Sequence, residues 1–473
     1  MIDLKLSMSK KINFFTKKLN KFKKSKALIL ENGKTFTYKD LITNSLRISR
    51  TLDTSKRLVF LLGQNNFETI IGYISFVNQG FAVALLDHRI NDIFLKRLVS
   101  KYNPKYIFCE RDKLKKDYHN ILNFKSYVLM QNKKIIDYNI DKELMLLMST
   151  SGSTGSPKLV KQSYQNILIN SQSIIKYLNI KSRDITITTL PISYVYGLSV
   201  INTHLFSGAQ IILTNRSMVE NNFWKLIKKF KVNNFSGVPY NYSIIEKILK
   251  SKVPPSIKYS TQAGGKMNHL LIKNIIEIYK KNKIKFFQMY GAAEATSRMS
   301  YLDWKYADKK IGSIGKAIPG GSFFLRNDRG QKITRSFKKG ELVYKGKNVF
   351  MGYAKNVKDL SLPDTNNGIL KTGDVAYFDK KGFYYIVGRK NRYCKIYGVR
   401  IDLSELEKIL LEQGIDTIMK EGGENKIIVY AKNIIKTKKK IKQLSSLTSI
   451  NLNVFIIKTF KKKNLTNNLK YKI

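Results

Sequence analysis

The stretch RLVFLLGQNNFETIIGYISFVNQGFAVALLD, residues 57–87, decides the fold class. Two apolar runs, at 57–65 and 81–87, enclose the segment TIIGYISFVNQG at 69–80, where small and apolar residues recur at spacings of three and four. Short continuous apolar runs are typical of buried strands, and the spacing of three and four is typical of a helix. The order strand, helix, strand predicts a unit of a parallel sheet.

Similar apolar runs recur downstream. They are KYIFCE, SYVLM, DITITTLPIS, AQIILTN, FSGVPY and IKFFQMYG, with helices expected at 163–178, 221–230 and 240–250. This alternation predicts an α/β fold, with a large N-terminal domain whose parallel sheets are covered by helices on both faces. Glycine and proline become more frequent after residue 310, which predicts a small β-rich subdomain of shorter antiparallel strands.

The chain beyond Arg389 has a different pattern. It reads as strands, a helix starting at Asp402 or Ser404, a hairpin through EGGENK and a final lysine-rich strand. At 473 residues the chain is longer than one hydrophobic core normally serves, so two or three domains are expected. We therefore predict a large domain over 1–390 and a small α+β C-terminal domain over 391–473.

The net charge is strongly positive, because 86 Lys and Arg stand against 33 Asp and Glu, which gives +53. The lysines are spread along the whole chain among many Asn, Ile, Tyr and Phe, and no nucleic-acid-binding motif organises them. This mixture favours the codon bias of an A/T-rich genome over nucleic-acid recognition. The charge implies a salt-sensitive attraction to nucleotides, CoA, acidic carrier proteins or membrane surfaces.

Several features favour a cytoplasmic protein. Cys109 and Cys394 lack CxxC spacing, which indicates reduced thiols, and the four histidines are scattered, which disfavours a zinc site. No run of roughly 18 apolar residues occurs, so no transmembrane helix is predicted. The N-terminus lacks the apolar core of a signal peptide.

The basic segment KKINFFTKKLNKFKK, residues 10–24, carries Phe15, Leu19 and Phe22 at helical spacing. A helix of this kind could rest weakly on a membrane surface. We favour a helix that packs this apolar stripe on the main body.

A loop rich in serine, threonine and glycine lies in LMSTSGSTGSPKLV, residues 147–160. Glycine lets backbone N–H groups close on an anion, and the hydroxyls add further donors, so the loop is built like an oxyanion cradle. It differs from the common nucleotide P-loop, because Gly152 and Gly155 are three apart and Pro157 precedes Lys158. Composition by itself favours a solvated loop.

Four later motifs make this loop specific. The ordered set STSGSTGSPK, LPISYVYGL, MYGAAEAT, KTGDVAYFD and GRKNRYCKIYGVRIDLSELE resembles the adenylate-forming (AMP-binding) superfamily of acyl-CoA synthetases, peptide-synthetase adenylation domains and luciferases. The resemblance runs from about Thr35 to the C-terminal segment. It implies that a carboxylate attacks the α-phosphate of ATP with Mg²⁺, and that a thiol then displaces AMP from the acyl adenylate. It also implies that the domain over 391–473 is a mobile lid.

The resemblance assigns the phosphates and the metal to two motifs. The phosphate loop would be Thr150, Ser151, Gly152, Ser153, Thr154, Gly155 and Lys158. In Tyr290, Gly291 and Glu294 of MYGAAEAT, the tyrosine ring would stack on adenine and the glutamate would hold Mg²⁺. The family's threonine is replaced by Ala293, which removes a hydrogen bond worth about 0.5–1.5 kcal/mol. Thr296 or a backbone amide is a candidate substitute.

Four further residues complete the nucleotide site by resemblance. Asp374 would accept hydrogen bonds from both ribose hydroxyls, and Arg389 would be its partner on the ribose side. Gly264 and Gly265 of AGGK would border the adenine, although a plain tight turn explains them nearly as well. An Asp–Arg pair can also be structural.

LPISYVYGL resembles the acyl-pocket motif. Its gate residue would be Tyr194, and Val195 stands where amino-acid activators carry an acidic residue. An α-amino acid is therefore disfavoured, because its buried ammonium group would lack a partner there. The same pocket would be lined by Gly197, Gly237, Val238, Pro239 and Tyr240, with core packing as the alternative for each.

The C-terminal segment carries the second half of the implied mechanism. Asn391 would be the hinge of the lid, and Gly398 would let a pantetheine arm pass the backbone. The family's catalytic lysine follows a glycine that NLTNNLKYKI lacks. One alignment assigns its role to Lys470, which we favour, and another places Asn468 there, in which case adenylation would be slow.

The expected function is a ligase that activates a non-amino-acid carboxylate, a fatty, aryl or short hydroxy acid, onto CoA. A near alternative loads the acyl group onto the phosphopantetheine of an acidic carrier protein. Ala293 and the displaced lysine leave open a degenerate member that only binds nucleotide. Nucleic-acid binding ranks last.

Overall fold

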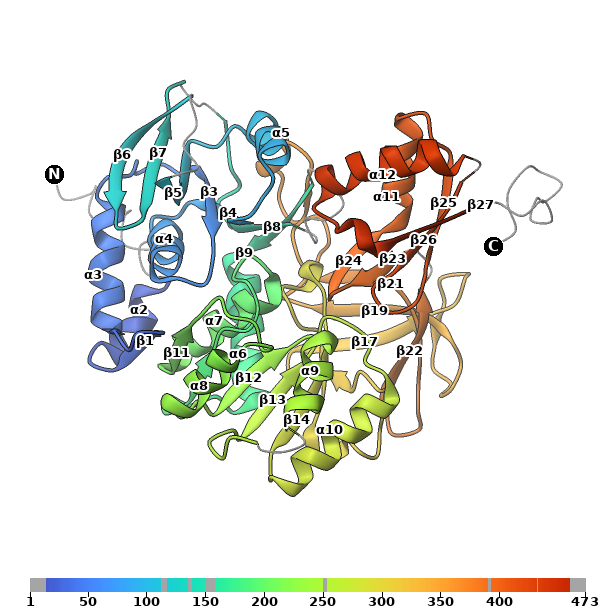
Figure 1. The fold of residues 1–473 in the computed structure, drawn as a ribbon. Helices are drawn as coiled ribbons and strands as arrows, with labels where there is room; N and C mark the ends of the chain where they lie inside the picture. Colours follow the sequence, from blue (N-terminus) through green and yellow to red (C-terminus); the bar gives the residue numbers. More distant parts are fainter. Residues whose placement is uncertain are drawn as a thin grey trace. The chain divides into compact units, whose positions relative to one another are not determined.

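The computed structural model describes residues 14–111, 117–134, 138–149, 158–249, 253–389, 393–431 and 433–459 (Figure 1). The chain divides into two compact units. Within the described ranges, the larger unit takes its residues from 14–89, 99–149 and 158–388, and the smaller unit from 90–98 and 389–459.

The larger unit contains a nine-stranded sheet in the order β16-β15-β14-β13-β12-β10-β11-β1-β2. Its strands are β1 (Lys26–Leu30), β2 (Thr35–Thr37), β10 (Ile185–Ile187), β11 (Gln210–Leu213), β12 (Asn234–Gly237), β13 (Tyr259–Gln262), β14 (Lys285–Tyr290), β15 (Ser300–Leu302) and β16 (Lys316–Ala317). The strands from β14 to β1 in this order run parallel, as the alternation of apolar runs and helices predicts. Antiparallel strands occupy both edges.

A second sheet of eight strands has the order β20-β9-β8-β4-β3-β5-β7-β6. Its strands are β3 (Leu58–Gly63), β4 (Ala82–Asp87), β5 (Tyr106–Glu110), β6 (Tyr118–Phe124), β7 (Tyr127–Asn132), β8 (Leu144–Ser149), β9 (Leu159–Ser163) and β20 (Gly352–Ala354). Residues 57–87 form the predicted unit, because β3 and β4 pair in parallel around a helix. The prediction that SYVLM joins a parallel array is wrong. It forms β7, which runs antiparallel to β5, because β6 and β7 form a hairpin with no crossover helix.

The main helices before residue 300 are α3 (Tyr38–Ser49), α4 (Phe67–Asn78), α5 (Asp92–Tyr102), α6 (Tyr164–Leu178), α7 (Val195–Ser207), α8 (Asn221–Lys229), α9 (Pro239–Leu249) and α10 (His269–Lys281). Three of them match the predicted ranges. Ser163 and Asn166 form a capping box that starts α6. Almost every residue of α4 is buried, which explains its small and apolar composition. Figure 1 shows α9 and α10 packed together, where they contact β12 and β14.

The short antiparallel strands expected after residue 310 form a five-stranded sheet in the order β18-β17-β19-β21-β22. They are β17 (Gly321–Arg326), β18 (Lys332–Ile333), β19 (Gly340–Gly346), β21 (Ile369–Phe378) and β22 (Tyr384–Arg389). This small sheet places Asp374 on β21, where the register against β19 shifts between the pairs Glu341–Val375 and Val343–Lys371.

The smaller unit has its own core of apolar side chains, among them Leu406, Leu410, Val429, Ile441 and Leu444. Its elements are the hairpin β23 (Tyr393–Ile396) and β24 (Val399–Asp402), α11 (Leu403–Glu412), β25 (Thr417–Glu421), β26 (Ile427–Ala431), α12 (Ile434–Thr448) and β27 (Phe455–Thr459). The predicted hairpin through EGGENK joins β25 to β26. The final strand, β27, is parallel to β26, with α12 as the crossover.

The basic N-terminal segment forms α2 (Thr16–Leu19) and the short helix η1 (Asn20–Phe22). Phe15 and Leu19 are fully buried, and the Phe15 amide donates a hydrogen bond to Asn78 Oδ1 at 3.0 Å. The favoured interpretation, packing of this stripe on the main body, therefore holds. No helix within the described ranges is long and apolar enough to cross a membrane.

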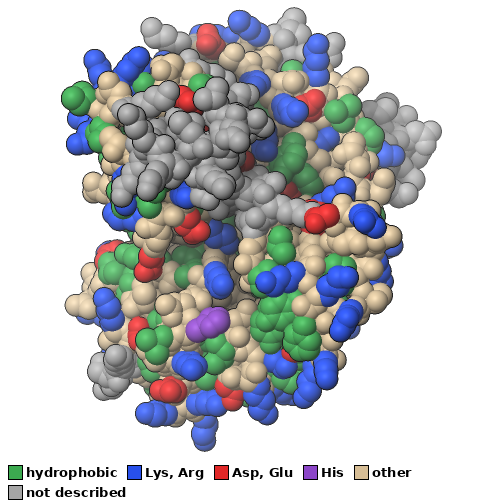
Figure 2. Space-filling model, turned by 90° about the vertical axis from the view of Figure 1, so that its right-hand side faces the viewer, with side chains coloured by type: hydrophobic (Ala, Val, Ile, Leu, Met, Phe, Trp, Pro, Cys, Tyr) green, Lys and Arg blue, Asp and Glu red, His purple; other side chains and the backbone are tan. Residues whose placement is uncertain are grey.

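The positive charge has no single focus on the face seen in Figure 2. Lys and Arg side chains are scattered across that face, with Asp and Glu side chains between them. A nucleic-acid-binding surface typically gathers its cations in one patch or stripe. The scatter agrees with the sequence-based preference for codon bias.

Candidate functional site

Two predicted nucleotide-binding residues meet in the larger unit. Tyr290 ends β14, and its hydroxyl donates a hydrogen bond to Oδ2 of Asp374 on β21. Asp374 is only 2% exposed, and its amide donates to Thr372 Oγ1 at 3.1 Å. A buried carboxylate held by a hydroxyl donor has a fixed orientation. The pair can present an aromatic ring and a carboxylate to one ligand.

The turn after Tyr290 is tightly folded. A Cβ added to Gly291 would lie 1.8 Å from the carbonyl oxygen of Ser297, so only glycine fits there. The helical turn η3 (Ala293–Ala295) follows, and then Thr296 and Ser297 adopt φ values of 53° and 109°. Such conformations are strained for non-glycine residues and concentrate at functional sites.

Glu294 and Lys158 both contact Tyr353. Tyr353 on β20 donates its hydroxyl to Glu294 Oε1 at 2.8 Å, and Lys158 Nζ lies 4.4 Å from the centroid of the Tyr353 ring. Glu294 is only 8% exposed. A cation and a carboxylate are thus brought together from the predicted phosphate loop and the MYGAAEAT turn. This arrangement suits an anion that is shared by a lysine and a metal ion.

Glu294 fits a magnesium ion that is bound mainly through phosphate. Among the described residues, no group of three or more His, Cys, Asp or Glu side chains could hold a metal by itself. Mg²⁺ commonly takes one or two carboxylates and completes its shell with substrate phosphates and water. A single ordered glutamate beside Lys158 therefore matches the chemistry that the motif implies.

The hydroxyl missing at Ala293 is not replaced by Thr296. The Thr296 hydroxyl is buried and donates to the Asn348 carbonyl at 2.7 Å, which commits it to holding the turn. Gln162 on β9 donates from Nε2 to the Ala293 carbonyl at 2.7 Å. The suggestion that Thr296 compensates is therefore wrong, and the turn is instead tied to β9.

Two predicted pocket residues, Tyr194 and Val238, lie beside Gly264, which is predicted to border the adenine. A Cβ added to Gly264, where φ is +84°, would lie 2.9 Å from the Tyr194 hydroxyl and 3.0 Å from Val238 Cγ1. Burial raises the pKa of Tyr194 to about 12, although the charge of Arg298 opposes the rise. The gate residue is therefore a neutral hydrogen-bond donor at neutral pH.

The structure also places the other predicted pocket residues and Gly265. A Cβ on Gly197 would lie 2.2 Å from the Pro191 carbonyl oxygen, and one on Gly237 would lie 3.0 Å from the Tyr242 ring. Val195 is half-buried at the start of α7, and Pro239 is the first residue of α9. Gly265 accepts a hydrogen bond from Gln262 Nε2 at 2.9 Å, which closes the AGGK turn.

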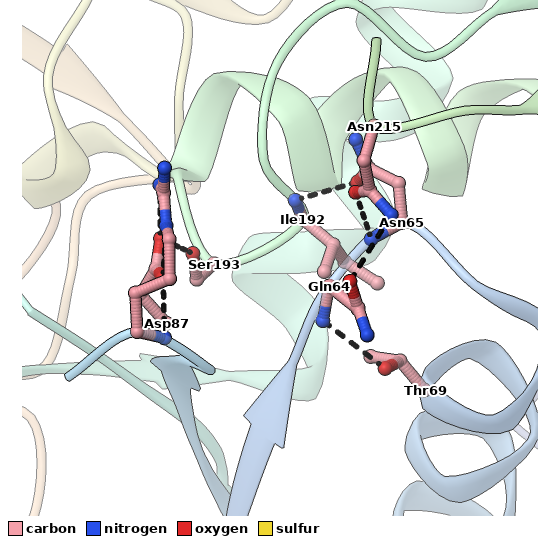
Figure 3. A network of polar contacts seen from close by, with 8 residues as sticks. Gln64, Asn65, Thr69, Asp87, Ile192, Ser193 and Asn215 are labelled. Atoms are coloured by element: carbon pink, nitrogen blue, oxygen red, sulfur yellow. Dashed lines mark hydrogen bonds and ion pairs between the residues drawn. The ribbon is translucent and has the colours of Figure 1, made fainter. Parts of the chain in front are cut away.

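A network of hydrogen bonds that the motifs did not reveal holds residues 190–193 of LPISYVYGL, here called the pocket loop (Figure 3). Asn65, just after β3, accepts from the Ile192 amide at 3.0 Å and donates to the carbonyls of Leu190 and Thr214, both at 3.2 Å. Asn215 accepts from the Asn65 amide at 3.1 Å. The sequence does carry a signal for this network, because Asn65 directly follows a buried strand of a parallel unit. Ligands bind at the carboxyl ends of such strands, so polar residues there are candidates for a site.

The same figure shows the end of β4. Ser193 donates to Asp87 Oδ2 at 3.4 Å, and Arg89 contacts both oxygens of Asp87 at 3.0 Å. Burial opposes ionisation, but the hydrogen bonds and charge of Arg89 hold the pKa of Asp87 below its usual range. The pocket loop is therefore fixed from both central strands of the eight-stranded sheet.

Several predicted residues receive no side-chain placement. Outside the described residues lie Thr150, Ser151, Gly152, Ser153, Thr154, Gly155, Asn391, Lys470 and Asn468. Arg389 ends β22, and only its backbone is described. Gly398 has φ +84° in the turn between β23 and β24 of the smaller unit.

Comparison with known proteins adds a family and a fold. A family model described as AMP-binding enzyme matches residues 15–354. A 2-succinylbenzoate–CoA ligase of Bacillus cereus is 30% identical over 271 residues, which span 57% of this chain and 55% of that protein. The 2-succinylbenzoate–CoA ligase of Bacillus subtilis (strain 168) is 26% identical over 399 residues, 81% of this chain and 79% of that protein.

A solved structure shows the same fold. It is a double mutant of o-succinylbenzoate CoA synthetase from Bacillus subtilis, bound with its product analogue OSB-NCoA. The match covers 97% of this chain and 97% of that chain, with a TM-score of 0.79 and 21% sequence identity. The predicted α/β architecture is confirmed by this likeness.

Proposed function

Because this chain belongs to the family of AMP-binding enzymes, we propose that it is an ATP-dependent ligase that adenylates an aromatic acid of the succinylbenzoate kind and transfers the acyl group to CoA. The observation that carries the proposal is the meeting of Lys158, Tyr353 and Glu294. It lies in the same unit as the pair Tyr290 and Asp374. The names of the relatives suggest the acid and the acceptor.

In the proposed reaction the chain acts by positioning and charge. Lys158 binds oxygens of the leaving pyrophosphate, which lowers the charge that the attacking carboxylate meets. Glu294, held by Tyr353, binds Mg²⁺, which when present neutralises phosphate oxygens. Asp374 accepts hydrogen bonds from the ribose and Tyr290 borders the adenine, with Gly264 and Gly265 beside it.

The acyl side excludes amino acids and admits a ring. Val195 offers no charge to an ammonium group, and the cluster of Leu190, Tyr196, Val238 and Met289 is apolar. Tyr194 donates from a neutral hydroxyl at the edge of this cluster. An aromatic acid with a carbonyl oxygen within reach of that hydroxyl matches the pocket better than a long alkyl chain. Asn391, Gly398 and Lys470 keep the lid roles that their motifs suggest, and a cytoplasmic location suits a reaction that consumes ATP and CoA.

The test is incubation with 2-succinylbenzoate, ATP, Mg²⁺ and CoA, with AMP and thioester read by mass spectrometry. AMP and the CoA thioester should form in equal amounts and only when the acid is present. Glu294→Gln keeps the shape and removes the charge, so AMP release should fall by about 10²–10³-fold. Glu277→Gln on the exposed face of α10 is the matched control and should leave the rate unchanged.

Other outcomes separate the alternatives. AMP release with acyl transfer to a phosphopantetheine carrier but not to CoA would replace the acceptor. Tight ATP binding without AMP release, for a panel of fatty, aryl and hydroxy acids, would favour the degenerate nucleotide-binding member.

A further inference from the structure

A buried arginine borders the acyl pocket. Arg298 follows the strained turn of Thr296 and Ser297 and is 2% exposed. Its Nε donates to Met289 Sδ at 3.4 Å, and its Nη1 donates to the carbonyl and hydroxyl oxygens of Ser297. Its guanidinium lies 3.8 Å from the centroid of the Tyr196 ring. The contacts that hold this cation in place are therefore made by neutral groups.

Among the described residues, no carboxylate forms an ion pair with this guanidinium. Within the part of the chain that the structure describes, Arg298 forms no ion pair, whereas the half-exposed Arg216 forms two. A buried charge without a counterion is costly, because the lost hydration is not replaced. A negatively charged ligand can supply the missing partner, because the guanidinium fork matches a carboxylate.

The charge faces the aromatic groups of the pocket. Burial raises the pKa of Tyr177, Tyr194 and Tyr196, and the positive charge of Arg298 opposes the rise in all three. Arg298 is therefore within electrostatic reach of the gate residue. Tyr177 also stacks on Tyr301, with ring centroids 4.0 Å apart. The tyrosine rings near the guanidinium are therefore themselves held by packing.

A small cavity borders Arg298. Its lining includes Arg298, Met289, Ser236, His204 and Tyr259. His204 bonds the Val200 carbonyl through Nδ1 at 2.8 Å, and burial lowers its pKa, so it is neutral. His204 Nε2 and the Tyr259 hydroxyl are buried and have no partner among the described residues.

Arg298 is the cation that an anionic ligand would meet in this cavity, as the charged groups around it show. Asp184, which acts electrostatically on His204 and Tyr259, is engaged by Asn233 Nδ2 at 3.0 Å and the Lys181 amide at 2.9 Å. Since His204 is neutral, Arg298 is the cation in the described lining of this cavity.

We infer that Arg298 binds a second carboxylate of the acid substrate, so that the enzyme selects dicarboxylates. The inference rests on the proposed ligase function and deepens it. One turn carries both contacts, because Glu294 serves the phosphate end and Arg298 lies four residues further on. A fatty or hydroxy acid without a second anion would leave the guanidinium unpaired, which is a strong basis for rejection.

The experiment compares three acids on the purified full chain with ATP, Mg²⁺ and CoA. 2-Succinylbenzoate has both carboxylates, 3-benzoylpropanoate lacks the one on the ring, and 2-butanoylbenzoate lacks the one on the chain. For the wild type, kcat/KM for the dicarboxylate should exceed that of either monocarboxylate on the order of 100-fold. Equal kcat/KM for the dicarboxylate and one monocarboxylate would overturn the inference while leaving the ligase function intact.

Variants assign the selectivity to Arg298. In Arg298→Met, kcat/KM for the dicarboxylate should fall on the order of 100-fold, mainly through KM, while the better monocarboxylate loses little. Arg298→Lys keeps the charge and should recover part of the loss. Arg183→Met, at an exposed position, is the matched control. A parallel loss for all three acids would show a merely structural role.

Thermal unfolding with a non-hydrolysable ATP analogue provides a readout without turnover. The dicarboxylate should raise the Tm of the wild type more than either monocarboxylate, and Arg298→Lys should reduce that difference. A larger Tm increase with the dicarboxylate but no AMP release would contradict the ligase function and still support the carboxylate site. Equal shifts from all three acids would sink the site.

Discussion

Tyr353 contacts both of the side chains that we propose to serve the phosphates, Glu294 and Lys158. Its hydroxyl orients Glu294, and its ring supports Lys158. Neither contact follows from a motif, because Tyr353 lies 59 residues beyond Glu294 in the sequence. One side chain thus contacts a carboxylate and a cation, which in the proposed reaction serve the same phosphate group.

Tyr353→Phe should separate these two contacts. The ring stays beneath Lys158, while Glu294 loses a hydrogen bond of the charged kind, worth about 1.5–3 kcal/mol. We expect ATP–pyrophosphate exchange to fall about 10- to 100-fold, and Tyr353→Leu to fall further because Lys158 loses its support as well. Tyr306→Phe, which changes an exposed tyrosine, should have no effect. An unchanged exchange rate in Tyr353→Phe would contradict the proposed geometry.

Ala293 stands where the resemblance places a threonine in the MYGAAEAT motif. Because Thr296 is committed to Asn348, the missing hydroxyl has no side-chain replacement from that position. Ala293→Thr should therefore raise the rate of adenylation about 2- to 10-fold, the value of one neutral hydrogen bond. Single-turnover formation of the acyl adenylate measures it. Ala293→Ser should share the gain and Ala293→Val should not; a gain in Val alone would assign the effect to packing.

At the scale of elements, the acyl pocket depends on a turn between β13 and α10. Gly264→Ala and Gly320→Ala impose the same backbone strain, since both glycines have φ near +85°. Each should cost about 1–2 kcal/mol of unfolding free energy. A Cβ at Gly264 also meets Tyr194 and Val238, whereas a Cβ at Gly320 meets nothing within 4 Å. Only Gly264→Ala should raise KM for the acid.

Denaturant unfolding and steady-state kinetics on both variants check this prediction. A KM that changes equally in the two variants would show that backbone strain, rather than the pocket, is responsible. An unchanged KM in Gly264→Ala would place the acid away from Tyr194.

At the scale of the whole molecule, many tyrosines are buried and lie within the core. Burial raises the pKa of Tyr38, Tyr73 and Tyr279 above the ordinary value near 10, and that of Tyr106 to about 12. The unfolded chain releases these protons near pH 10 and the folded chain at higher pH. Above pH 10 the unfolded state therefore binds fewer protons, and the free energy of unfolding falls as pH rises.

We expect stability to be insensitive to these tyrosines below about pH 9 and to decline steeply above pH 10. Urea unfolding at high salt, where the loss of lysine charge contributes little, measures the decline. Tyrosinate absorbance should appear together with unfolding. Full tyrosinate absorbance in a protein that remains folded would contradict the prediction.

Much of the architecture could be predicted from patterns along the chain. Residues 57–87, the helices α6, α8 and α9 and the β-rich segment all follow from periodicity and turn residues. The family, the fold class and the ligase class that the motifs predict are borne out by the comparisons. The direction of β7 was not predictable in this way, because an apolar run carries no information about its pairing partner.

By itself, the sequence determined where the chemistry-bearing residues stand: Lys158 after a phosphate-type loop, Glu294 and Tyr290 in one turn, and Asp374 in KTGD. Tertiary structure alone decided how they combine, since Tyr290 reaches Asp374 across 84 residues. It also decided that Arg298 is buried without a carboxylate partner among the described residues. The reason is physical: periodicity and turn chemistry are local properties, whereas burial and charge pairing depend on which distant strands the folded sheets bring side by side.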